Sequence, residues 1–579
     1  MILQALVDYY EALVTQGKIA RPGWAKGKVS WALEIDENGQ LLDVLPLRHP
    51  SGDGKKMIPR DMEVPVQMKR SGKGAPSYYL CDNTKYIFGI EDGTITEKSR
   101  KAFQNFRNLH LEKLAAVENN MAKAIVAFSN RYTPEDFLSL TIVSDKPELL
   151  QGNDNCVFIS TTGVFAQTIP DIAETVNEQS ESGIIGTCMV TGKQTEIARI
   201  HNSVKGPLGN SPNGWTLVSF DKDSTAYDSF GKKQGYNAPV SKYAAFAYTS
   251  ALNALLADRR HVKVIGNTTV VYWAIDAEAQ YQNAFDTLLD GADDTVKQEE
   301  LNALMKAVAE GKEYRFEGLP VNPENDFCIL GISPNAARLS VRFFYRRSFG
   351  ELVRNLKQHY DDIQIVSDNR NTWSSMPLWA LLRETVNDKA PLPQLAGDVM
   401  KAMLEGGHYP ETLMNQTLLR IRAEHMVTRG RAGIIKAYLI RNTENHPDRD
   451  LIKEVSTVSL NMESNYTPYV LGRLFAVLEG TQQTANPGIN ATIKDRFFNS
   501  ACATPAAVFP LLLRLSNSHI RKLETGSGIF WSKQIGELMQ KLGESFPAHL
   551  SLQEQGAFIL GYYHQTQRRF EKKENTETK

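Results

Sequence analysis

The feature that most constrains the fold is a change of hydrophobic periodicity near residue 349. Before it, short apolar segments that alternate with polar residues are separated by Gly, Pro, Asn and Asp, which is typical of strands and turns. From Phe349 onward, apolar residues recur at the three- and four-residue spacing of helices. The pattern predicts an α+β fold, in which a mixed amino-terminal half with antiparallel sheets and long loops is followed by an all-α carboxy-terminal helical bundle.

Residues 326–347, at this change, are predicted to form two strands joined by a turn. The first apolar run ends at Ile332, and Ser333-Pro334-Asn335 has the composition of a turn. The second run alternates, so one face of its strand should carry four apolar side chains, Leu339, Val341, Phe343 and Tyr345. The other face should carry a row of three arginines, Arg338, Arg342 and Arg346. Such a row suits contact with nucleic acid or a neighbouring subunit, and equally suits the protected edge of a sheet.

A chain of 579 residues is too long for a single core, so several domains are expected. Residues 1–130 should form an amino-terminal α+β region with a basic loop, and residues 131–348 a mixed α/β continuation of it. Residues 349–461 should form a helical domain. Residues 462–579 should form a carboxy-terminal helical bundle.

Local patterns also place elements within the mixed half. Helical spacing predicts one long helix over residues 99–128. Residues 78–90 favour a hairpin-like turn centred on Asp82-Asn83, and residues 262–275 a hairpin that turns at Gly266-Asn267. Residues 215–220 are predicted to be a strand.

Composition excludes fibrous, disordered and membrane-spanning classes. With 42% hydrophobic and 23% charged residues, the chain resembles ordinary soluble proteins. Its apolar runs are shorter than the ~20 residues that span a bilayer. The cysteines are scattered without a CxxC pair and should be buried reduced thiols: Cys81, Cys156, Cys188, Cys328 and Cys502. We therefore expect a cytoplasmic protein without a membrane partner.

The net charge of -1 conceals a segregation of charge along the chain. Residues 48–107 hold 12 Lys and Arg against 7 Asp and Glu. Residues 338–357 and residues 420–441 each hold 6 cations against 1 anion. Residues 276–312 are acidic, with 9 Asp and Glu against 3 Lys. The basic islands are candidates for contact with a polyanion, and the acidic stretch for a basic partner or solvent.

No motif predicts catalysis, a cofactor or a metal site. Residues 186–194 resemble a phosphate-binding loop, but five residues separate the two glycines, and Gln194 replaces the Ser or Thr that would hold magnesium. His201, His261 and His425 lie next to cations, which permits a phosphate contact, although surface or core histidines are the commoner case. The interpretation is a non-enzyme. A metal-dependent nuclease with dispersed carboxylates stays open as the alternative.

Two sets of loop residues combine cations with Gly, Asn and Gln, which suits phosphate contact, close backbone approach and the reading of base edges. The first set is Gln67, Lys69, Arg70, Gly72, Lys73, Gly74 and Asn83. The second set is Lys205, Asn210, Lys232, Lys233, Gln234 and Asn237. We predict that both sets bind DNA. Ordinary solvated loops have the same composition and are the competing interpretation.

Four segments in this order resemble a known family, the large subunit of type I-C CRISPR surveillance complexes, called Cascade. They begin at Met1 (MILQALVDYYEAL), Thr216 (TLVSFDKDSTAYDSFGKKQGYNAPVSKYAAFAYTSALNALL), Leu330 (LGISPNAARLSVRFFYR) and Tyr469 (YVLGRLFAVLEG). The resemblance covers essentially the whole chain, and none of the four segments is a catalytic signature.

The resemblance implies a non-catalytic subunit of an RNA-guided complex that binds the protospacer-adjacent motif of duplex DNA. It implies a carboxy-terminal bundle near the displaced single strand and recruitment of a separate helicase-nuclease. The implied partners also include the guide RNA, the backbone subunits and the RNA-processing subunit of Cascade.

The resemblance further implies that small subunits are made from the same gene through an internal translation start. Met462 is well placed for that start, because it precedes the apolar helix predicted from Tyr469 to Leu478. A product of residues 462–579 would be a helical bundle of its own. The plain alternative is that Met462 is an ordinary apolar residue.

Overall fold

The computed structural model describes the chain except for residues 52–55, 67–76, 178–182, 207–208, 210, 212–213, 221–224, 291–294, 367–375, 388–391 and 570–579. The chain divides into two compact units. Unit 1 comprises Leu3–Asn202 and Val218–Ala251, and unit 2 comprises Ser203–Leu217 and Leu252–Lys579. The boundaries of the four predicted domains stay predictions.

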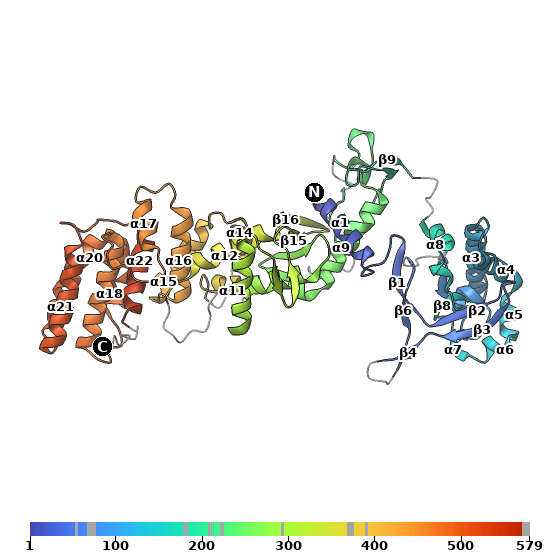
Figure 1. The fold of residues 1–579 in the computed structure, drawn as a ribbon, viewed down its shortest axis with the longest axis horizontal. Coiled ribbons are helices and arrows are strands. Elements are labelled where there is room, and N and C mark those ends of the chain that lie inside the picture. Colours follow the sequence, from blue (N-terminus) through green and yellow to red (C-terminus); the bar gives the residue numbers. More distant parts are fainter. Residues whose placement is uncertain are drawn as a thin grey trace. The chain divides into compact units, whose positions relative to one another are not determined.

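Unit 1 is built on a four-stranded sheet of order β3 (Leu41–Pro46), β2 (Trp31–Ile35), β8 (Asn155–Ser160) and β7 (Cys81–Asn83). The β2–β8 pair is parallel and the other pairs are antiparallel. Helices α3 (Glu97–Leu114) and α4 (Asn120–Arg131) lie beside this sheet (Figure 1) and share an apolar cluster with it. The sheet is mixed because the long segment between β2 and β8 lets β8 run beside β2 in the same direction.

Unit 1 contains further helices and strands besides this sheet, α3 and α4. They are α1 (Ile2–Thr15), the ribbon of β1 (Trp24–Val29) and β6 (Arg60–Pro65), the ribbon of β4 (His49–Pro50) and β5 (Met57–Ile58), α2 (Thr84–Phe88), α5 (Pro134–Ser139), α6 (Thr141–Ser144), α7 (Pro147–Leu150), η1 (Ala166–Thr168), α8 (Pro170–Glu174), η2 (Thr175–Asn177), the ribbon of β9 (Ile185–Thr187) and β10 (Gln194–Glu196), η3 (Ser229–Gly231) and η4 (Gln234–Asn237). Helix α9 (Lys242–Ala257) begins in unit 1 and ends in unit 2.

Two predictions for unit 1 are wrong in detail. The predicted helix over residues 99–128 is two helices, because the Asn119 side chain accepts a hydrogen bond from the Met121 backbone N–H and starts α4 afresh. The predicted hairpin centred on Asp82-Asn83 is instead the end of strand β7, and Asn83 is the residue that precedes α2. Both errors concern the positions at which elements begin or end.

Unit 2 contains an antiparallel sheet of order β11 (Val262–Ile265), β12 (Thr268–Ala274), β15 (Asp326–Asn335) and β16 (Arg338–Ser348). The predicted hairpin at Gly266-Asn267 is confirmed by the pairing of β11 with β12. The predicted strand over residues 215–220 is wrong, because Trp215 and Thr216 make only isolated bridges. The other elements before residue 349 are η5 (Arg259–His261), α10 (Ala279–Asp290), α11 (Thr295–Ala309), β13 (Tyr314–Phe316) and β14 (Leu319–Val321).

The predicted strand pair is observed, but its turn and its register differ from expectation. The turn lies at Ala336-Ala337, and Ser333 and Pro334 belong to β15. Pro334 lies beyond the last pair between β15 and β12, at Ile332, so its missing N–H interrupts no ladder on that side. The chain continues as a strand through the residues that have turn composition.

A β-bulge in β16 breaks the predicted row of arginines. Gly331 pairs with Phe343 and Ile332 pairs with Val341, which leaves Arg342 as an extra residue. Arg338 therefore lies on the sheet face of Phe343 and Tyr345, whereas Arg346 lies on the opposite face. The predicted apolar row divides in the same way, and Val341 is 42% exposed.

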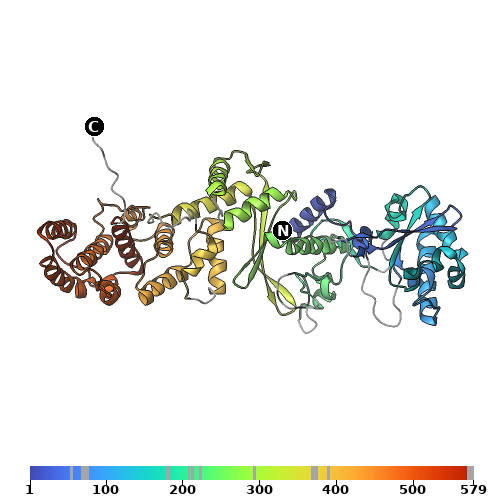
Figure 2. The ribbon, with the colours of Figure 1, turned by 90° about the horizontal axis from the view of Figure 1, so that it is seen from below.

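Helices follow β16 to the end of the described chain, as predicted (Figure 2). They are α12 (Phe349–Ile363), α13 (Leu378–Arg383), α14 (Pro393–Glu405), α15 (Glu411–Glu424), α16 (Arg429–Asn442), α17 (Arg449–Val455), α18 (Thr467–Ala485), α19 (Ile493–Ala503), α20 (Pro505–Ile520), α21 (Thr525–Gln540) and α22 (Leu552–Gln567). The α+β fold class is thus observed. One apolar cluster joins sheet residues such as Ile329 to α22 residues such as Leu560.

Helices α18 and α22 approach each other closely at two glycines. A Cβ atom on Gly472 would collide with the Phe558 carbonyl, and one on Gly561 would collide with the Tyr469 carbonyl. Any larger residue would force the two backbones apart, so these glycines set the spacing of the central helix pair of the bundle.

Candidate nucleic-acid interface

The loop of residues 227–237, in unit 1, is organised around the side chain of Asn237. Its amide nitrogen lies within hydrogen-bond distance of four backbone carbonyl oxygens, those of Ala226 (3.2 Å), Tyr227 (3.0 Å), Lys232 (2.9 Å) and Gln234 (3.2 Å). Its carbonyl oxygen accepts a hydrogen bond from Ser229 Oγ at 3.1 Å. Asn237 was predicted from the sequence to contact DNA. In the structure its side chain holds the loop together through hydrogen bonds.

The same loop presents an aromatic side chain and two cations to solvent. Phe230 is 95% exposed and has φ of 52°, a left-handed conformation that is rare for a bulky residue. Gln234, half-buried, has φ of 51°. Lys232 and Lys233 are exposed. An aromatic face can stack on a base, and the two ammonium groups can neutralise phosphates, so this loop has the chemistry of a nucleic-acid contact.

Phe230 was missed by the reasoning from sequence. A detectable signal was present, because Phe230 stands between the small residues Ser229 and Gly231 and is followed by Lys232-Lys233. An isolated aromatic residue among small and charged neighbours has no apolar partner nearby in sequence, and it is therefore a candidate for exposure and binding.

Lys205 belongs to unit 2, whereas Lys232 and Lys233 belong to unit 1. Its side chain is exposed, and its backbone N–H donates to Asn253 Oδ1 at 2.7 Å. The Asn253 side chain also donates to the Ser203 carbonyl at 3.2 Å, so it forms hydrogen bonds with the backbone of both Ser203 and Lys205. Asn210, predicted with Lys205, lies outside the described residues.

Most of the first predicted set, Gln67, Lys69, Arg70, Gly72, Lys73 and Gly74, lies outside the described residues. Strand β6, which ends at Pro65, leads into this segment. Asn83 is described and half-buried, and its side-chain oxygen is buried without a hydrogen-bond partner. The DNA-contact role of these residues stays a prediction.

The three predicted arginines of β16 are exposed, but two of them have partners within the sheet. Arg346 donates two hydrogen bonds to Asp326 Oδ2, at 3.0 and 2.8 Å. Arg342 donates through Nε to Ser333 Oγ at 2.9 Å. Arg342 also lines a cavity of about 760 Å³ together with Lys401 and Asn267. Arg338 lies near the turn, where its backbone bridges to Thr216.

The basic island of residues 420–441 is largely internal. Arg431, Lys436 and Arg441 are at most 5% exposed. Arg441 Nε donates to Asp362 Oδ2 at 2.6 Å, and Lys436 donates to the Asp362 carbonyl at 2.7 Å. Burial lowers the pKa of Lys436 to about 8. The excess of cations in this part of the sequence is therefore no measure of surface charge, because the matching carboxylates come from elsewhere in the chain.

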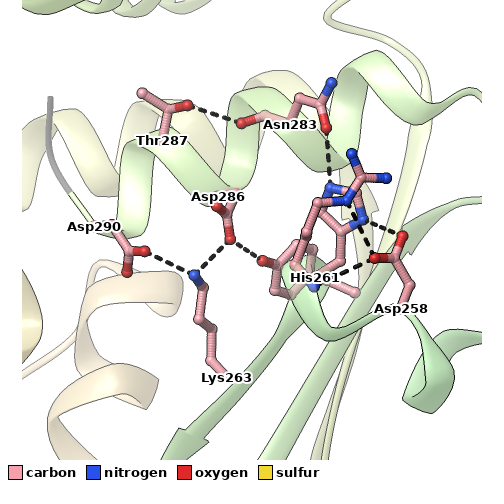
Figure 3. A network of polar contacts seen from close by, with 9 residues as sticks. Asp258, His261, Lys263, Asn283, Asp286, Thr287 and Asp290 are labelled. Carbon is pink, nitrogen blue, oxygen red and sulfur yellow. Dashed lines mark hydrogen bonds and ion pairs between the residues drawn. The ribbon is translucent and has the colours of Figure 1, made fainter. Parts of the chain in front are cut away.

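His261, which follows two cations in the sequence, is part of an internal network of polar contacts (Figure 3). His261 is 4% exposed, and its Nδ1 lies 2.9 Å from Asp258 Oδ2 and its Nε2 2.9 Å from Asn283 Oδ1. With both ring nitrogens engaged, it joins η5 to α10 and has no free nitrogen for a phosphate. Although burial raises the pKa of Asp258, the hydrogen bond with His261 lowers it below its ordinary value overall.

The acidic stretch of residues 276–312 contributes to the same network. Lys263 lies 2.7 Å from both the Asp286 and the Asp290 carboxylates. Burial lowers the pKa of Lys263, but its hydrogen bonds to the two carboxylates raise it above the ordinary value. Part of the predicted acidic surface is thus neutralised by an ion pair that ties β11 to α10.

The other two histidines singled out from the sequence are at least half-buried. His201 is 5% exposed, and its Nδ1 lies 2.7 Å from the Tyr248 hydroxyl. Burial lowers the pKa of His201. His425 ends α15 with φ of 51°. The segment that resembles a phosphate-binding loop is the β9–β10 ribbon, in which the Cys188 N–H donates to the Lys193 carbonyl, and not a loop that opens a helix.

All five cysteines are buried and free, as predicted. Within the described part of the chain, no cluster of three or more His, Cys, Asp or Glu residues is arranged to hold a metal ion. Nor does any helix in that part combine the length and the apolar character needed to cross a membrane.

Comparison with known proteins gives one finding that covers nearly the whole chain. A family model described as CRISPR-associated protein (Cas_Csd1) matches residues 6–570. No curated protein matches the sequence.

Proposed function

Because the chain belongs to the Cas_Csd1 family of CRISPR-associated proteins, and is thereby a component of a multi-subunit CRISPR complex, we propose that it is the large subunit of a type I-C RNA-guided surveillance complex. In this role it binds the protospacer-adjacent motif of duplex target DNA and stabilises the opened duplex. The family match over residues 6–570 is the observation that carries the proposal.

The exposed loop of residues 227–237 supports the DNA-binding part of the proposal. In RNA-guided recognition the guide reads the long target by base pairing, and protein reads only a short duplex motif and the backbone. Lys232 and Lys233 offer phosphate contacts, and Phe230 offers a stacking surface. The hydrogen bonds of Asn237 fix the loop before binding, which lowers the entropy lost on association.

In this role the chain carries out no catalytic step. A separate helicase-nuclease, recruited after the duplex opens, cuts the DNA. The carboxy-terminal helices lie near the displaced strand, and residues 462–579 are also made separately as small subunits. The assembly acts in the cytoplasm with guide RNA, backbone subunits and an RNA-processing subunit.

The test uses the assembled complex with guide RNA and without the helicase-nuclease. Wild-type complex should bind target duplex that carries the correct motif more tightly than duplex with a scrambled motif, and should leave both uncut with Mg²⁺ or Mn²⁺ present. Lys232→Gln with Lys233→Gln should weaken binding to both duplexes and reduce the slope of log affinity against log salt by about 2.

The matched control is Lys18→Gln with Lys123→Gln, which removes the same charge from exposed positions of the same unit outside the basic islands. The control should bind like wild type. Equal affinity of the wild-type complex for both duplexes would contradict motif reading, and cleavage by the purified complex would contradict a non-catalytic role.

A further inference from the structure

Gln167 stands apart in the described part of the chain, because both of its side-chain polar atoms are buried without a hydrogen-bond partner. Only 2% of the residue is exposed. It lies in η1, in the turn that follows strand β8. Buried amides in native proteins are normally paired with protein, water or a ligand, because an unpaired one loses its hydration without compensation. The position therefore requires a partner from outside the chain.

Gln167 lines a cavity of about 280 Å³ beside the β1–β6 ribbon of unit 1. The same cavity is lined by two cations, Arg21 and Arg60, and by two anions, Asp61 and Glu63. Arg21 pairs with Glu63 at 3.5 Å. Because positive and negative charges balance, the cavity favours a neutral group over a phosphate.

Aromatic side chains give this cavity flat apolar surfaces. Trp24 is 2% exposed, and the Arg21 guanidinium lies over its ring at 4.6 Å from the centroid. Phe165, half-buried, also lines the cavity. The volume lies just below the usual range for ligand pockets, ~300–1,000 Å³, so the occupant is a single small ring system. A nucleobase is a flat, neutral group with a donor and an acceptor on its edge, and it therefore meets the requirements of this cavity.

We propose that this cavity holds one unstacked base of a nucleic-acid strand, and that the Gln167 amide hydrogen-bonds to the edge of that base. The inference rests on the proposed function, which supplies the nucleic acid. A glutamine amide pairs in bidentate fashion with adenine, so adenine is the expected base. Strand β6 ends at Pro65, two residues before Gln67, the first residue of the predicted DNA-contact loop.

Entry of a base requires a small rearrangement of the cavity. The Gln167 amide atoms have almost no solvent contact, so a side chain must swing aside to expose them. The Arg21 side chain is 47% exposed, and it is held by a 3.5 Å ion pair with Glu63 and by its contact with the Trp24 ring. Its guanidinium can leave the Trp24 ring, and the entering base takes its stacking place.

The experiment measures binding of the purified full chain to fluorescent single-stranded DNA by anisotropy. Each strand is made of thymidines with one central adenosine or one central abasic residue. Wild type should prefer the adenosine strand about tenfold. Gln167→Leu should abolish this preference and keep the affinity for the abasic strand. Its melting temperature should equal or exceed that of wild type, because the leucine removes an unpaired buried amide.

Gln104→Leu, at an exposed position on α3, is the matched control and should keep the preference. A wild-type chain that binds both strands equally would overturn this inference alone. So would a Gln167→Leu protein that melts at lower temperature with the preference intact, since water would then hold the amide. A wild-type chain that binds no strand at all would remove the basis of the proposed function as well.

Discussion

The backbone N–H of Leu80 donates a hydrogen bond to Nε2 of His110 across 3.0 Å in the buried core of unit 1. Leu80 has φ of 59°, an unfavourable conformation for leucine, and is fully buried. His110 Nδ1 lies 2.8 Å from the Phe106 carbonyl, so the ring is neutral with its proton on Nδ1. The histidine thus holds a strained residue at the start of β7, the strand that carries Asn83.

This relationship predicts acid sensitivity of unit 1. Burial lowers the pKa of His110 to about 4, whereas an unfolded histidine titrates near ~6.5. As pH falls from about 6.5 to about 4, the unfolded chain binds a proton that the folded chain rejects, so stability falls by up to about 3 kcal/mol. His110→Gln should reduce the loss of melting temperature between pH 7 and pH 5. His49→Gln, an exposed control, should leave it unchanged, and an unchanged loss in His110→Gln would contradict the role of His110.

Removal of the Asn237 side chain should loosen the loop of residues 227–237. Asn237→Ala changes no charge but deletes the contacts to four carbonyl oxygens, so Lys232 and Lys233 lose their fixed positions. We expect duplex affinity to fall about tenfold, near 1.4 kcal/mol, with an unchanged salt slope. Faster amide hydrogen exchange within the loop would accompany the loss. Asn108→Ala, at an exposed position on α3, is the control, and equal affinity of both variants would argue against a fixed loop.

Phe230→Ala should weaken nucleic-acid binding without destabilising the fold. The side chain is 95% exposed, so its removal costs little apolar burial. If it stacks on one base, affinity should fall by about 1–3 kcal/mol. Phe230→Tyr keeps the aromatic face and should keep the affinity. A melting temperature that falls together with affinity would instead indicate that Phe230 supports the loop.

The helical half was predictable because its apolar residues repeat over many turns, as in α18 and α22. The bulge at Arg342 was not predictable from the sequence. A single extra residue leaves the alternation of apolar and polar residues intact, while it exchanges the sheet faces to which the residues on its two sides belong. Likewise, Arg441 is paired with Asp362, which lies 79 positions away, and a local count of charge does not register such a partner.

Substitution of Arg441 should strongly lower the free energy of unfolding of the helical part. Arg441→Met leaves the Asp362 carboxylate, 8% exposed, buried without its guanidinium, which typically costs about 3–5 kcal/mol. Urea unfolding should show a lower midpoint for this variant. The control is Arg347→Met, which removes an exposed pair with Glu351 and should change stability by less than about 1 kcal/mol. Similar midpoints for both variants would mean that the buried pair contributes nothing net.

Met462 allows a clean test of the internal start, because its side chain is available for substitution. It lies in the connector between α17 and α18, is 44% exposed, and contacts Arg568 through its sulfur. Met462→Ala should therefore leave the full-length chain folded. Expression of the gene alone should yield full-length protein and a second product of residues 462–579, and Met462→Ala should remove only the short product.

Two controls separate internal translation from proteolysis. Met426→Ala, at another exposed methionine in the helical half, should leave both products in place. Loss of the first start codon should remove the full-length chain and keep the short product, which proteolysis of the full-length chain could not supply. A short product that persists in Met462→Ala would place the start elsewhere. In the product of residues 462–579, helices α18 and α22 would retain their close contact at Gly472 and Gly561, so this product should be helical when isolated.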